Sequence, residues 1–208
     1  MHDTAYRYCE LFYNTYVKDT KQALNVVEIG SQDVNGSLKP IFNNPLIRYT
    51  GVDYVEGNNV DIVLKEPYVL PFKDASVDVI ISSSCLEHTE MFWMTFLEMM
   101  RILRPDGLLY INVPSKAGPY HRYPVDCWRF YPDSGRALQV WGKRCGVNCA
   151  LIESFVGHPQ NDGWEDFVGV YIRDESFINQ YPNRIINSIN DYDNGFIYNS
   201  DEILNHIR

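Results

Sequence analysis

Residues 26–37 read VVEIGSQDVNGS, an apolar run that ends at a glycine and continues into a polar loop. The run from Asn25 to Gly30 predicts a buried strand, because β-branched residues are followed by a residue typical of turns. Gly30 lets backbone approach a ligand closely, and we expect Gly36 to adopt a positive φ. The G-x-G-x-x-G and P-loop fingerprints are both absent. The loop is therefore either a plain turn or a binding loop of another kind.

Strands and helices are predicted to alternate along the rest of the chain. Apolar runs predict further strands at 48–53, 60–64, 77–82, 108–114, 150–156 and 167–172. Helical spacing of apolar residues predicts helices at 3–22, 89–103 and 132–145. The second of these helices should stop at RPDG, residues 104–107, because Pro and Gly both break helices. This alternation indicates βαβ units and a parallel sheet with right-handed crossovers.

The length and composition bound the classes of protein that remain. The 208 residues suit one domain with a tail, which we place at 1–173 and 174–208. We expect the tail to be irregular with short helices, packed on the body or on a partner subunit of a homodimer. The chain has 18 Lys and Arg against 27 Asp and Glu, a net charge of −9. This balance disfavours a nucleic-acid partner and a polybasic membrane patch.

Cysteine usage and the N-terminus predict a cytoplasmic protein. The five cysteines form no Cys-x-x-Cys pair, so we interpret them as reduced thiols. The N-terminal residues show no basic segment followed by an apolar one, so no signal peptide is predicted. The chain also has no apolar run of the ~20 residues that a membrane span needs.

Asp53 ends the second predicted strand and is expected to lie beside the loop that begins at Gly30. The carboxyl ends of parallel strands meet at one edge of an open α/β sheet, where such folds bind ligands. An acidic residue at this position accepts hydrogen bonds from ribose hydroxyls in nucleotide-binding folds. We therefore predict that Asp53 holds a ribose.

Three further segments complete a recognisable order of motifs. They are LPFKDASVD at 70–78, SSSCLEHT at 82–89 and RILRPDG at 101–107. In this order the motifs resemble class I S-adenosylmethionine-dependent methyltransferases of the type-11 kind. That family's pattern is E/D-x-G-x-G-x-G, an acid ending strand two, L-P-F-x-D-x-S-F-D, E-H after strand four, and R-x-L-K/R-P-G-G.

The resemblance covers about residues 24–140 and departs from the family pattern at two points. The middle glycine of the first motif is missing, as in a subgroup with a G-S-x-x-V-N-G-S loop, and Asp106 replaces a glycine of the last motif. An Asp is tolerated in such a turn. The resemblance implies a Rossmann-like, doubly wound, mostly parallel seven-stranded sheet with helices on both faces. It also implies S-adenosyl-L-methionine as cofactor and S-adenosyl-L-homocysteine as product.

The resemblance assigns cofactor-binding roles position by position. Glu28 and Gly30 would face the methionine part, with Ser31 lining that loop, and Asp53 would hold the ribose. The adenine would lie against Tyr54, although ordinary packing is an equal alternative for that ring. The remaining residues would close over the base or back the sulfonium: Leu70, Ser82 and Ser83.

The candidate catalytic residues are His88 and three residues of the loop after the strand at 108–114. His88 could remove a proton from an acceptor hydroxyl, because its ordinary pKa of about 6.5 suits a base at neutral pH. Its alternative is a positioning role, since Glu87-His88 belongs to the family pattern. The loop, PYHRYPVDCWRFYP at 119–132, carries His121, Asp126 and Arg129 among aromatic rings. Such a set either lines a pocket for a polar acceptor or forms a structural ion pair.

The function expected from these motifs is methyl transfer to a small polar acceptor. The subgroup often occurs with surface-polysaccharide enzymes, so O-methylation of a sugar or sugar-like precursor in glycan biosynthesis is the leading hypothesis. The alternatives are N-methylation of a small amine, for which Trp128, Tyr123 and Glu87 could form a cation pocket, and a non-catalytic cofactor-binding subunit. No metal-ligand spacing is visible in the sequence, so no metal is predicted.

Overall fold

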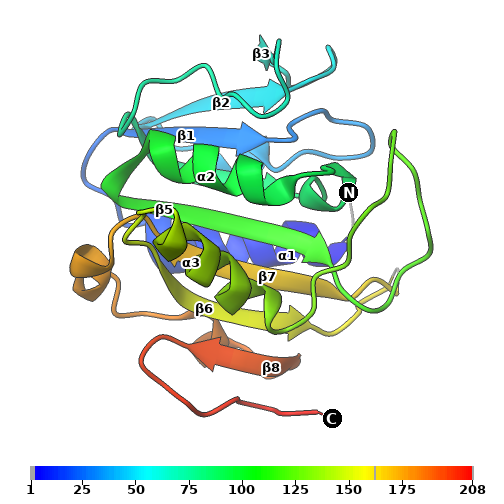
Figure 1. The fold of residues 1–208 in the computed structure, drawn as a ribbon, viewed down its shortest axis with the longest axis vertical. Coiled ribbons are helices and arrows are strands. Elements are labelled where there is room, and N and C mark those ends of the chain that lie inside the picture. The colour runs from blue at the N-terminus through cyan, green and yellow to red at the C-terminus, as the bar shows by residue number, and fades with distance from the viewer. Residues whose placement is uncertain (1–2, 162, 208) are drawn as a thin grey trace.

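The computed structural model describes residues 3–161 and 163–207 and contains an eight-stranded sheet (Figure 1). The sheet order is β3-β2-β1-β4-β5-β7-β6-β8. The strands are β1 (Leu24–Ile29), β2 (Ile47–Asp53), β3 (Ile62–Val63), β4 (Val77–Ser83), β5 (Leu103–Pro114), β6 (Ala150–Gly157), β7 (Asp166–Ile172) and β8 (Tyr192–Ile197). The interpretation of the N-terminus as lacking a signal peptide includes residues 1 and 2, which lie outside the described residues.

The predicted mostly parallel α/β sheet is confirmed, with one strand more than expected. The five strands from β3 to β5 pair in parallel. The pairings β5–β7, β7–β6 and β6–β8 are antiparallel. The strands β1 to β5 therefore point their carboxyl ends toward one edge, which is the right-hand side of Figure 1.

Helices cover both faces of the sheet, as predicted. The helix α1 (Asp3–Phe12) packs on one face, and α2 (Phe92–Ile102) and α3 (Ser134–Arg144) pack on the other (Figure 1). Successive strand residues point to opposite faces. Val26 accordingly joins the core beneath α1, whereas Val27 joins the core beneath α2 and α3. No helix within 3–161 or 163–207 has the length and apolar character required to span a membrane.

Two predicted element boundaries were wrong. The first helix, expected to run to residue 22, ends at Phe12 and continues only as a π-helical turn, Tyr13–Val17. The predicted turn at 104–107 instead lies inside β5. Val77 of β4 is opposite Leu103, and Val79 is opposite Leu108, so a single residue of β4 faces four residues of β5. The four residues 104–107 therefore bulge from the strand, which suits a proline that cannot donate to a ladder.

The described part of the predicted tail, residues 174–207, packs on the body and contributes a strand that we did not expect. It contains the short 3-10 helices Glu175–Gln180 and Ile185–Ser188, followed by β8 on the outer edge of β6. Glu153 of β6 is fully buried and accepts hydrogen bonds from the backbone N–H groups of Ile185 and Ile186 at 2.8 and 3.0 Å. The hydroxyl of Tyr16 donates a third hydrogen bond to the same carboxyl group.

We predict that Tyr16→Phe destabilises the fold by about 1–3 kcal/mol, because it removes one donor from the buried Glu153 carboxyl group. Urea denaturation followed by circular dichroism measures this change in the free energy of unfolding. Tyr6→Phe is the matched control, since Tyr6 is 39% exposed. Equal stability of the two variants would contradict a supporting role for the Tyr16 hydroxyl.

Candidate functional site at the carboxyl edge of the sheet

The loop after β1 is held tightly between its neighbours. Gly30 has a φ of +81°, and a Cβ added there would lie 2.5 Å from the Cβ of Cys85. Its backbone N–H donates to the Val52 carbonyl of β2 at 2.9 Å. Gly36 also has the expected positive φ, at 138°. A side chain at position 30 would therefore clash and strain the backbone, which explains why glycine stands there.

Asp53 ends β2 at this edge and organises the loop from β1. One carboxylate oxygen accepts the backbone N–H of Gln32 at 3.0 Å, and the other accepts that of Val55 at 3.2 Å. Asp53 is 8% exposed, while the following residue, Tyr54, is 47% exposed. Each carboxylate oxygen can accept two hydrogen bonds, so both retain capacity for another donor.

Glu28, near the end of β1, and Ser31, in the loop that follows, share one hydrogen-bond partner, Asn59. The amide of Asn59 donates to Glu28 Oε2 at 3.0 Å and to the Ser31 carbonyl at 3.1 Å. The Tyr49 hydroxyl donates to the same Glu28 oxygen. Burial raises the pKa of Glu28 to about 7, although these two donors oppose the shift. Hydrogen bonds from Tyr49 and Asn59 thus hold the Glu28 carboxyl group in place, and it titrates near neutrality.

The three other predicted cofactor residues are also fixed by neighbours. The backbone of Leu70 is bound on both sides: its N–H donates to Glu98 Oε2 at 2.9 Å, and its carbonyl accepts from Arg101 at 2.9 Å. Ser82 Oγ donates to the Ile29 carbonyl at 3.0 Å, joining the ends of β4 and β1. Ser83 Oγ lies 3.3 Å from Asn112 Oδ1 of β5.

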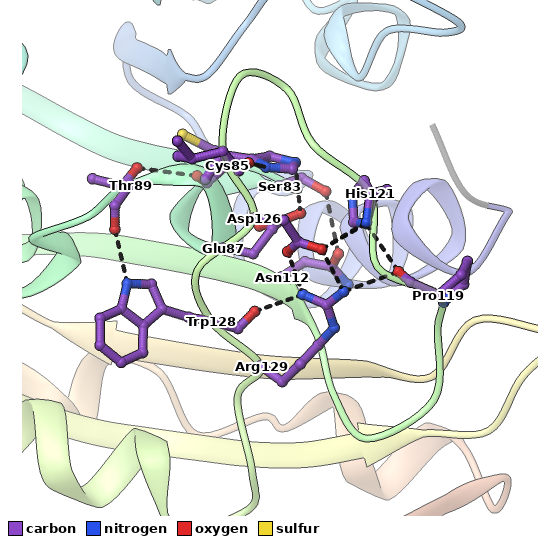
Figure 2. Close-up of polar contacts among 12 residues, drawn as sticks. Ser83, Cys85, Glu87, Thr89, Asn112, Pro119, His121, Asp126, Trp128 and Arg129 are labelled. Carbon is purple, nitrogen blue, oxygen red and sulfur yellow. Dashed lines mark hydrogen bonds and ion pairs between the residues drawn. The ribbon is translucent and has the colours of Figure 1, made fainter.

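The loop between β5 and α3 folds back over this edge around an ion pair. Asp126 accepts two hydrogen bonds from the Arg129 guanidinium, at 2.5 and 2.8 Å, and one from the backbone N–H of His121 at 2.7 Å (Figure 2). The hydrogen bonds from Arg129 lower the pKa of Asp126 to about 2. Arg129 also donates to the carbonyls of Pro119 and Trp128. Asp126 and Arg129 therefore hold the loop in shape.

Glu87 lies at the base of this loop, in the short 3-10 helix Leu86–His88 that follows β4. Its carbonyl accepts from the backbone N–H groups of Cys127 and Trp128 at 2.7 and 3.3 Å. The side chain is fully buried, and neither carboxyl oxygen has a hydrogen-bond partner among the residues described. Burial raises the pKa of Glu87 to about 8.

His88 meets His121 beside Glu87. The two imidazole rings pack edge to face with centroids 4.9 Å apart. His88 Nδ1 lies 2.5 Å from the Val125 carbonyl, so Nδ1 carries the proton and Nε2 keeps a free electron pair. Burial lowers the pKa of His88, which favours this neutral form. The fold thus brings His88 to the loop that carries His121, Asp126 and Arg129. The sequence placed the last three in one loop but did not show that His88 meets them.

Sequence reasoning missed one contact within the site and one hollow at the ends of the loop between β5 and α3. The Tyr123 hydroxyl donates to Gln32 Oε1 at 3.0 Å, which connects the acceptor-side loop to the loop after β1. A hollow of about 340 Å³ also lies beside the loop, with Lys116, Arg136 and His206 among its lining residues. Its lining comes from segments about 90 residues apart, so no local motif signals it.

Comparisons with known proteins find sequence similarity in part of the chain and the same fold in solved structures. Residues 34–111 match the model of a methyltransferase domain. An uncharacterized methyltransferase of Mycolicibacterium vanbaalenii is 31% identical over 105 residues, which are 50% of this chain and 37% of that protein. The chain therefore spans well under half the length of this curated relative.

Solved structures show the same fold at low sequence identity. The 1,6-didemethyltoxoflavin-N1-methyltransferase of Burkholderia thailandensis, solved with S-adenosylhomocysteine, has a TM-score of 0.64 at 18% identity and covers 83% of this chain and 80% of its own. The [4+2]-cyclase SpnF has a TM-score of 0.57 at 13% identity and covers 81% of both chains. The chain thus has the Rossmann-like methyltransferase fold, on which more than one chemistry occurs.

The raised pKa of Glu28 predicts a pH-dependent stability. Between about pH 4.5 and 7 the folded chain keeps a proton that the unfolded chain has released, so stability falls as pH rises through this window. Glu28→Gln cannot titrate, so the stability of the wild type relative to this variant should fall by at most about 1.4 kcal/mol per pH unit. Urea denaturation at a series of pH values measures it. A difference that is constant or rises with pH would contradict the shift.

Proposed function

We propose that the protein is an S-adenosylmethionine-dependent methyltransferase. The observation that carries the proposal is Asp53, which ends β2 beside the Gly30 loop and keeps unused hydrogen-bonding capacity. Ribose hydroxyls are donors of the kind that such a carboxylate accepts. The match of residues 34–111 to a methyltransferase domain supports the same conclusion.

The cofactor would lie across the carboxyl ends of β1, β2 and β4. Asp53 would accept from the ribose hydroxyls, the exposed Tyr54 ring would lie against the adenine, and Leu70 would border the base. The residues nearest the methionine part and the sulfonium would be Glu28, Gly30, Ser31, Ser82 and Ser83. The cofactor supplies an activated methyl group and leaves as S-adenosyl-L-homocysteine. The chain's part is to hold the acceptor in line with that methyl, and orientation alone can be worth about 7–11 kcal/mol.

The acceptor would bind under the loop that contains His121. The side chains of His121 and His88 are 31% and 14% exposed, so both can contact a bound molecule. Asp126 and Arg129 act through the shape of the loop, as positioning residues. A sugar or sugar-like hydroxyl compound of glycan biosynthesis is our proposed acceptor, because imidazole groups suit polar hydroxyl partners and the net charge of −9 disfavours nucleic acid.

N-methylation of a small amine is the second candidate. The nearby residues Trp128 and Tyr123 are 36% and 51% exposed, and their rings offer faces for a cation. The fold is also shared with an N1-methyltransferase. A cofactor-binding subunit without catalysis is a third candidate, which turnover alone would exclude.

Asp53→Asn tests the position of the cofactor. It should weaken binding of S-adenosylhomocysteine by about 2–3 kcal/mol, because a charge-assisted hydrogen bond is lost. Asp78→Asn is the matched control, since Asp78 also accepts a backbone N–H, from Asn25 at 2.8 Å, but is the second residue of β4, near its amino end and away from the site. Isothermal titration calorimetry of both folded variants gives the affinities. Equal affinity of the two variants would place the ribose elsewhere.

Methyl transfer itself is tested by mass spectrometry with methyl-labelled cofactor. The protein is incubated with a pool of sugar nucleotides and, separately, with a pool of small amines. We expect label on an oxygen of a sugar and formation of S-adenosylhomocysteine, both reduced in Asp53→Asn but not in Asp78→Asn. Label confined to amines would favour the second candidate. Cofactor binding without label in either pool would contradict the proposed acceptor classes.

A further inference from the structure

Glu87, His88 and His121 form a cluster that no local motif shows. Glu87 and His88 follow β4, and His121 lies 33 residues further along, in the loop after β5. One ligand-type atom from each residue lies within 4.8 Å of those of the other two. The three side chains come from two loops that meet only because β4 and β5 are adjacent in the sheet.

The Glu87 carboxyl group lacks the donors that its burial demands. It is completely buried, and within the described parts of the chain neither oxygen has a hydrogen-bond partner. His88 Nε2 lies 3.6 Å from Oε1, beyond hydrogen-bond distance. A buried polar group without compensation costs several kcal/mol. The nearby Arg129 does not meet this need, since its guanidinium is bound to Asp126 and to two carbonyls.

Both imidazoles are oriented in the manner of metal ligands. His88 Nδ1 faces the Val125 carbonyl at 2.5 Å, which leaves Nε2 as its free nitrogen. His121 Nδ1 lies 3.3 Å from the Pro119 carbonyl and 3.5 Å from Asp126 Oδ2. A carbonyl or carboxylate on the second ring nitrogen is the usual way in which a ligating histidine is fixed. The Asp126–Arg129 pair shown in Figure 2 keeps that carboxylate in place.

We propose that Glu87, His88 and His121 bind one divalent transition-metal ion. Two imidazoles and one carboxylate are a donor set suited to Zn²⁺ or Fe²⁺. Bonds of about 2.0–2.2 Å require ligand atoms roughly 3–3.5 Å apart, so small side-chain rotations would close the site. The partly exposed His121 leaves a path for the ion to enter.

The chemical consequence of this site rests on the proposed function, whereas metal binding itself does not. Three protein ligands would leave a coordination position open for a water molecule or an acceptor hydroxyl. A hydroxyl bound there would lose its proton more easily, as metal-bound water does. The ligand role also excludes base catalysis by His88, because both roles use the same Nε2 electron pair.

The test is a titration of the full chain, freed of metal by chelation, with Zn²⁺ and with Co²⁺. We expect one equivalent per chain by calorimetry and mass spectrometric metal analysis, and visible absorption from Co²⁺ in a site of low symmetry. Glu87→Gln and His121→Ala should each weaken binding about 100-fold or more, since even outer residues of metal sites contribute 10- to 100-fold. Circular dichroism and S-adenosylhomocysteine binding should show that both variants remain folded.

Control variants separate this site from other donors on the chain. His158→Ala removes an imidazole paired with Asp193 at 3.0 Å, and Cys127→Ser removes an exposed thiol close to Glu87 in the fold. Both should keep one equivalent at unchanged affinity. Absence of binding to the wild type, or equal binding by wild type and His121→Ala, would overturn the proposal. Since cofactor affinity is measured independently, that failure would leave the proposed methyl transfer untouched.

Discussion

The parallel pairing of four adjacent strands is the constraint on which the whole site depends. β1 lies between β2 and β4, so Ile29 stands opposite both Val52 and Ser82, and the next pairing sets Ser83 opposite Asn112. Strand ends that are up to 85 residues apart in the chain thus meet at one edge. The candidate side chains of the site lie at these strand ends or in the loops that follow them, which is where open α/β sheets bind ligands.

The loop between β5 and α3 covers this edge of the sheet and contacts the loops that follow β1 and β4. The partly buried Asp126–Arg129 pair shapes the loop, and the Glu87 carbonyl anchors it to the end of β4 through two backbone N–H groups. Tyr123 reaches across to Gln32 of the opposite loop. The same contacts bring His88 and His121 face to edge. A change in the ion pair would therefore act on the acceptor side through geometry.

The sequence predicted those features of the structure that depend on residues close together in the chain. Buried apolar runs predicted the central strands, the acid at Asp53 marked the end of β2, and Gly30 and Gly36 marked the loop after β1. It was uninformative where structure depends on distant partners. β8 reads YDNGFI, without clear alternation, and forms against β6. The bulge at 104–107 looked like a turn, and the cluster of Glu87 with His121 depends on two loops meeting.

The central claim is that this edge of the sheet binds the nucleoside of S-adenosylmethionine opposite the loop with His121. A crystal structure of the chain with S-adenosylhomocysteine tests it most directly. The account predicts the ribose hydroxyls on the Asp53 carboxylate, the adenine beside Tyr54, and the sulfur directed toward His88 and His121. A ligand bound at another edge, or with its ribose away from Asp53, would contradict it.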